Sequence, residues 1–155
     1  MHKLALVIAT KDRPESFARL LRSLRDQTLL PEQVIIVDSG LKSLKAIIAS
    51  VSNFPIQYFH HRPPSISKQR NVGIDHVHSD ITLVGFLDDD VELEFNALEN
   101  MLIQWEEASS TTAGIAFGSK AAFPPAITST ATLPSCEALC ANIGSPTISP
   151  IAKIF

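Results

Sequence analysis

The segment ITLVGFLDDDVE, which runs from Ile81 to Glu92, decides the fold of this chain. Its first half is a continuous apolar run, which is typical of a β-strand that is covered on both faces of a parallel sheet. Three consecutive carboxylates, Asp88, Asp89 and Asp90, follow the run directly. Parallel α/β sheets bind their ligands beyond the carboxyl ends of the strands, so these aspartates lie where a ligand is expected.

The three aspartates allow two interpretations. They repel one another unless a positive charge lies between them, and a divalent cation that prefers oxygen ligands, Mg2+ or Mn2+, would supply that charge. Alternatively, they form a solvated acidic turn at the start of the next helix, where aspartate is favoured by capping and by the helix dipole. The rest of the sequence decides between the two.

Strand-like runs alternate with helical patterns along most of the chain. We expect further strands at Leu4–Thr10, Gln33–Val37, Ile56–His61 and Gly114–Gly118. The helices are expected at Glu15–Gln27, at Leu44–Val51, from a cap at Ser65 or Ser67 to Val77, and at Phe95–Glu107. This alternation predicts an α/β fold with a mostly parallel sheet between two layers of helices, joined by right-handed crossovers.

The order of the strands follows if the chain doubles back once. The first four strands then lie in the order 3-2-1-4, with a switch point between the first and the fourth. In that order Thr10, Asp38 and Asp88 line one crevice at the carboxyl edge of the sheet. This convergence is a prediction from topology.

Length and composition favour one folded domain with a tail. The chain has 155 residues, of which 45% are hydrophobic, and this is enough for a single core. Beyond residue 120, prolines interrupt a segment rich in Ser, Thr and Ala that shows no clear periodicity. We predict a domain over residues 1–120 and an irregular tail over residues 121–155.

Charge and hydropathy exclude several classes of partner. The formal net charge of −3 gives no attraction for nucleic acid. No apolar run approaches the roughly 18 to 20 residues that span a bilayer, and no secretory signal is visible, so we expect no transmembrane segment and a cytoplasmic location, in solution or peripheral to the membrane. The GxGxxG, GxxxxGK[ST] and GxSxG motifs are absent from the sequence.

Other residues offer the parts of a nucleotide diphosphate site. Asp38 follows a strand and can accept hydrogen bonds from a base or a ribose, or can simply form a turn with Ser39 and Gly40. Lys68 and Arg70 lie near the start of a helix, whose dipole favours anions, or form a solvated helical face. Four histidines, interpreted as surface residues, have no recognised metal-site spacing: His60, His61, His76 and His78.

Four motifs in register carry a family resemblance. The segments ALVIATKDRPESFARLLRSLRDQT, VIIVDSG, SISKQRNVGID and FLDDDVEL occur in this order between Lys3 and Glu107. Together they resemble the nucleotide-binding half of a family 2 glycosyltransferase. The resemblance implies a three-layer α/β/α, Rossmann-like fold of the GT-A type. It also implies a nucleotide-diphosphate sugar donor, a UDP- or dTDP-sugar, used with Mg2+ or Mn2+ for inverting transfer to an acceptor that the sequence does not name.

The resemblance also implies roles for individual residues. Asp88 and Asp90 match the metal-binding DXD motif, although Asp89 can replace one of the pair. The positions that match the nucleotide site are Thr10, Arg13, Glu15, Asp38, Lys68, Arg70 and Asp88.

The second half of the family pattern is not matched. Glu137 is the only carboxylate after Glu107, and the basic-aromatic QxxRW-type element of the family is missing, so the catalytic base is unknown. We therefore expect a truncated domain, either an active glycosyltransferase or a non-catalytic remnant that binds the nucleotide sugar. An aspartate-based phosphotransfer domain is a less favoured alternative, because the first strand ends in Thr10 and the third in His60 and His61.

Overall fold

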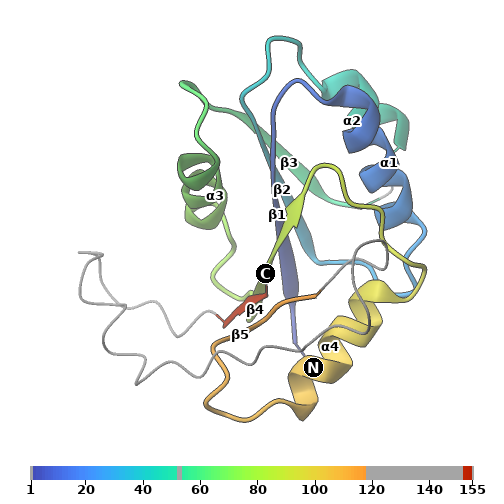
Figure 1. Cartoon of the computed structure of the whole chain (residues 1–155), viewed down its shortest axis with the longest axis vertical. Helices are drawn as coiled ribbons and strands as arrows, with labels where there is room; N and C mark the ends of the chain where they lie inside the picture. Colours follow the sequence, from blue (N-terminus) through green and yellow to red (C-terminus); the bar gives the residue numbers. More distant parts are fainter. Residues whose placement is uncertain (1, 52–53, 118–151, 155) are drawn as a thin grey trace.

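The computed structural model describes residues 2–51, 54–117 and 152–154 and has the predicted α/β architecture (Figure 1). Strands and helices alternate from the first strand to α4. The elements are β1 (Leu4–Thr10), α1 (Pro14–Arg25), β2 (Gln33–Asp38), α2 (Lys45–Val51), β3 (Ile56–His60), α3 (Ile66–Asp75), β4 (Leu83–Asp88), α4 (Ala97–Glu107), β5 (Gly114–Ile115) and β6 (Ala152–Ile154).

The sheet has the order β3-β2-β1-β4-β6-β5, and each of its neighbouring strands pairs in parallel. The predicted order 3-2-1-4 is therefore confirmed. The short strand β6 comes from the segment predicted to be an irregular tail and lies beside β4. The other residues of that tail and the predicted boundary at residue 120 fall outside the described residues.

The central strand β1 packs on both of its faces, because successive side chains of a strand point to opposite sides. Leu4, Leu6 and Ile8 belong to a core shared with α1, α2 and α4. Ala5 and Val7 belong to a second core shared with α3. Figure 1 shows α3 on one side of the sheet and the other three helices on the opposite side. The three-layer prediction is thus confirmed.

Helix α1 supplies the most completely buried helical face. Pro14 begins it, in the first turn where a missing backbone N–H costs nothing. Its apolar residues recur at helical spacing and are fully buried, and each such side chain contributes about 1.5–3 kcal/mol relative to an exposed one. They are Phe17, Leu20, Leu21 and Leu24.

Helix α3 lies unusually close to β1. Ser65, one of the two predicted caps, accepts a hydrogen bond from the backbone N–H of Lys68. Gly73, in the last turn of the helix, faces Val7, and a Cβ at this position would clash with the Val7 side chain. The glycine therefore permits the close approach that brings the first turn of α3 to the carboxyl end of β1.

None of the helices in the described part of the chain has the length and apolar character needed to cross a membrane.

Candidate functional site

A cavity of about 490 Å³ opens at the carboxyl edge of the sheet. It lies between the ends of β1 and β4, where the strand order reverses, and the start of α3 closes one side. This is the switch point at which open α/β sheets bind their ligands. The lining residues are Ala9, Thr10, Lys11, Arg13, Pro64, Ser65, Ile66, Gln69, Asp88, Asp89 and Asp90.

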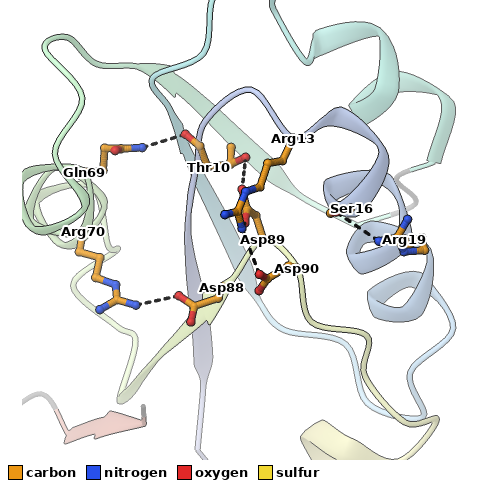
Figure 2. Close-up of polar contacts among 9 residues, drawn as sticks. All are labelled: Thr10, Arg13, Ser16, Arg19, Gln69, Arg70, Asp88, Asp89 and Asp90. Carbon is orange, nitrogen blue, oxygen red and sulfur yellow. Dashed lines mark hydrogen bonds and ion pairs between the residues drawn. The ribbon is translucent and has the colours of Figure 1, made fainter. Parts of the chain in front are cut away.

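The three consecutive aspartates face in different directions (Figure 2). Asp89 is buried, and its Oδ2 accepts a hydrogen bond of 2.7 Å from the hydroxyl of Thr10. The carboxylates on either side are turned outward, with side chains 60% exposed for Asp88 and 56% exposed for Asp90. Asp88 and Asp90 are thus the two carboxylates of the cluster that are exposed at the cavity. Their match to a DXD motif stays a prediction.

Each outward carboxylate is paired with an arginine. Arg70 Nη2 lies 2.9 Å from Asp88 Oδ1, and the Arg70 guanidinium is 5.6 Å from the centre of the Phe86 ring. Arg13 Nη1 lies 3.0 Å from Asp90 Oδ2 and 3.2 Å from Asp89 Oδ1. Guanidinium groups thus balance part of the charge of the acidic cluster.

Gln69 fixes the start of α3 to the ends of two strands. It is 4% exposed, and its Nε2 donates hydrogen bonds to the carbonyl oxygens of Thr10, at 3.0 Å, and of Val37, at 2.7 Å. One side chain therefore holds the ends of β1 and β2 against the helix that closes the cavity. Gln69 is not among the predicted site residues, although its i, i+4 spacing from Gly73 places it on the sheet-facing side of α3.

Asp38 is fully buried at the end of β2, beside Thr10 of β1. Its Oδ1 accepts a hydrogen bond from the backbone N–H of Gly40, and its Oδ2 accepts one from the hydroxyl of Tyr58, both at 2.6 Å. Burial, together with this bond to Asp38, raises the pKa of the Tyr58 hydroxyl. The turn that the sequence offered as the alternative to nucleotide binding is therefore present.

The loops after β1 and β2 are joined to each other. Asp12 adopts the left-handed backbone conformation with φ of 54°, which aspartate tolerates better than most residues. Its Oδ1 accepts a hydrogen bond of 2.8 Å from the backbone N–H of Leu41. This link holds in place the loop after β1, which contains the cavity-lining residues Lys11 and Arg13.

The structure brings together five of the eight predicted site residues. Thr10, Arg13, Asp88 and Asp90 line the cavity, and Arg70 borders it through its bond to Asp88. The other predicted positions do not line it. Glu15 and Lys68 are exposed on the first turns of α1 and α3. Asp38 is buried and does not line the expected crevice. The nucleotide contacts predicted for these three residues stay predictions.

The cavity does not hold a preformed cage for a metal. Within residues 2–51, 54–117 and 152–154, no three His, Cys, Asp or Glu side chains are arranged to hold a metal ion. Asp88 and Asp90 nevertheless supply exposed carboxylate oxygens to one cavity. Mg2+ is commonly bound by one or two carboxylates completed by substrate phosphates and water, and this donor set fits that mode.

A family model described as Glycosyl transferase family 2 matches residues 5–129 of the chain. The chain belongs to glycosyl transferase family 2. No curated protein matches its sequence. The family assignment confirms the resemblance carried by the four sequence motifs.

Solved structures share the fold of this family 2 chain. The crystal structure of S. aureus TarS 1-349 superposes with a TM-score of 0.64 at 19% identity, over 80% of this chain and 38% of that one. The complex of TarS 1-349 with UDP gives a TM-score of 0.65 at 19% identity, and the complex with UDP-GlcNAc gives 0.62 at 20% identity. Both cover 80% of this chain, and 38% and 37% of those chains. The chain therefore spans less than two fifths of the length of these TarS structures.

Proposed function

We propose that this family 2 chain binds a nucleotide-diphosphate sugar in the cavity at the carboxyl edge of the sheet, as the donor-binding part of a glycosyltransferase. The observation that carries the proposal is the cavity itself, which combines two outward carboxylates with two arginines at the switch point of the sheet. Its volume of about 490 Å³ lies within the range of small-molecule sites. The solved TarS complexes with UDP and UDP-GlcNAc, which share the fold, support a UDP-sugar as the donor.

In this proposal different residues at the cavity bind the metal ion and the diphosphate. Asp88 and Asp90 would hold Mg2+ or Mn2+, which when bound neutralises charge on a departing diphosphate. Arg13 and Arg70 carry guanidinium groups that bind phosphate oxygens through paired hydrogen bonds. Lys11 adds an ammonium group to the same lining. In this proposal Asp38 contacts the base or the ribose, and its bonds to Gly40 and Tyr58 set the orientation of its carboxylate.

The transfer step needs a group that removes a proton from the acceptor hydroxyl. Among the described residues that line the cavity, the three aspartates of the cluster are the only carboxylates. This observation favours a second version of the proposal, in which the chain holds the nucleotide sugar without turning it over. Both versions share the donor site, so binding is the first property to measure.

Calorimetry with UDP and Mn2+ tests the shared claim. The unaltered chain is expected to bind UDP in the presence of Mn2+, and Asp88→Ala and Asp90→Ala are each expected to weaken that binding by at least about tenfold. Asp75→Ala is the matched control, because Asp75 is an exposed acid at the other end of α3. No binding of UDP, or binding indifferent to Asp88 and Asp90, would reject the proposal.

A second measurement separates the two versions. An active glycosyltransferase is expected to hydrolyse a UDP-sugar or to transfer its sugar, and the release of UDP measures this reaction. A chain that binds UDP with Mn2+ yet releases none from UDP-sugars is a donor-binding module.

A further inference from the structure

A divalent cation and the two arginines compete for the outward carboxylates of the cavity, because a cation held by Asp88 and Asp90 would lie beside both guanidinium groups and repel them. Asp88 Oδ1 and Asp90 Oδ2 each accept a bond from a guanidinium, at 2.9 Å and 3.0 Å. A divalent cation that takes these oxygens has to displace the guanidinium groups of Arg70 and Arg13. Displaced guanidinium groups then lie beside a cation unless an anion arrives with it.

We propose that Arg13 and Arg70 exchange partners when the donor binds. In the structure they hold the carboxylates of Asp90 and Asp88, and in this proposal they pass to the diphosphate of the donor when a divalent cation takes those carboxylates. This inference rests on the proposed function and deepens it, because it assigns to the two arginines a link between metal binding and diphosphate binding.

The surroundings of each arginine permit the exchange. The Arg70 side chain is 33% exposed and its guanidinium lies over the Phe86 ring, so the side chain keeps an apolar support when its bond to Asp88 is broken. The Arg13 side chain is 57% exposed and bonds to buried Asp89 as well as to Asp90. Arg13 therefore remains at the cavity after Asp90 is taken by a cation.

The exchange makes the metal and the diphosphate bind cooperatively. A cation alone has to break two ion pairs, which leaves Arg70 without its carboxylate and Arg13 with Asp89 only. A diphosphate alone meets two arginines that are already paired with the outward carboxylates of Asp88 and Asp90. When both arrive together, the cation takes the carboxylates and the arginines take the phosphate oxygens, so each ligand raises the affinity for the other by the same factor.

The test compares two affinities in the full chain, that for Mn2+ alone and that for UDP at saturating Mn2+, both measured by calorimetry. Arg70→Gln and Arg13→Gln are expected to raise the affinity for Mn2+ alone about two- to fivefold, because a competing cation is removed from an exposed carboxylate. The same variants are expected to lower the affinity for UDP about tenfold.

Lys45→Gln is the matched control for net charge, since Lys45 is exposed on α2 and does not line the cavity. Arg70→Lys is a second control, because it changes the same position and keeps the positive charge. It is expected to bind Mn2+ alone as weakly as the unaltered chain does, whereas a folding defect at this position would affect both variants. If the unaltered chain binds Mn2+ and UDP but Arg70→Gln and Arg13→Gln leave the Mn2+ affinity unchanged or lower, the exchange is wrong and the donor site stands. If the unaltered chain binds neither ligand, the proposed function fails and the exchange fails with it.

Discussion

The hydroxyl of Thr10 donates a hydrogen bond of 2.7 Å to the buried carboxylate of Asp89, across 79 positions of sequence. This bond ties the end of β1 to the turn after β4. It also decides the directions of the neighbouring carboxylates, because Asp89 faces inward and Asp88 and Asp90 are consequently turned toward the cavity and solvent.

Replacement of Asp89 is expected to harm stability more than replacement of its neighbours. Asp89→Ala leaves the Thr10 hydroxyl and one bond of Arg13 without their partner, which is expected to cost about 1–3 kcal/mol. Asp90→Ala removes one exposed ion pair and is expected to cost no more than about 1 kcal/mol. Urea unfolding of the two variants measures the difference, and equal losses would show that the inward position of Asp89 does not matter for folding.

The buried amide of Gln69 is expected to stabilise the edge of the sheet. Gln69→Ala removes two hydrogen bonds to the carbonyl oxygens of Thr10 and Val37 and is expected to lower the free energy of unfolding by about 1–3 kcal/mol. Gln104→Ala, on the exposed face of α4, is the control and is expected to change it by less than about 0.5 kcal/mol. A Gln69→Ala chain as stable as the control would contradict this role.

The ionisation of Tyr58 reports the bond to Asp38. Tyr58 is the only tyrosine of the chain, so the ultraviolet absorbance of tyrosinate follows this residue alone. Burial and the bond to Asp38 raise its pKa, so its midpoint is expected above the ordinary value of about 10. Asp38→Asn is expected to move the midpoint down without abolishing the shift, because burial is the larger cause.

The raised pKa of Tyr58 makes the free energy of unfolding depend on pH under alkaline conditions. Because the folded chain holds the Tyr58 proton more tightly than the unfolded chain, the stabilising contribution is fully present below pH about 10 and is lost as the pH rises through the folded pKa. Tyr58→Phe lacks this loss, so its unfolding free energy is expected to depend less on pH in that range. Identical pH profiles of the two chains would contradict the assignment.

The contact between Gly73 and Val7 is expected to limit how α3 can be altered. Alanine in a helix is ordinarily favoured over glycine by about 1 kcal/mol, but here the added Cβ would clash with Val7. Gly73→Ala is therefore expected to destabilise the chain by about 1–3 kcal/mol despite the gain in helix propensity. Asn71→Ala, on the exposed face of the same helix, gives the propensity effect alone. Thermal unfolding of both variants checks the sign.

The sequence by itself determined the layers and the order of the first four strands of the sheet. Apolar periodicity distinguished strands from helices, and the alternation of the two required parallel strands with crossovers. Parallel strands bring their carboxyl ends to one edge of the sheet, and this arrangement predicted that Thr10 and Asp88 lie at one crevice. Both residues line the cavity. Ser65 was likewise one of two visible caps.

The tertiary structure alone decided which side chains face that cavity. The inward turn of Asp89 depends on Thr10 and Arg13, the burial of Asp38 depends on Tyr58, and the place of Gln69 depends on the carbonyl groups of two strands. Each of these contacts joins segments that are distant in sequence, and local periodicity carries no information about such partners. The sequence therefore located the cluster of three aspartates, while packing between distant segments decided which two are exposed at the cavity.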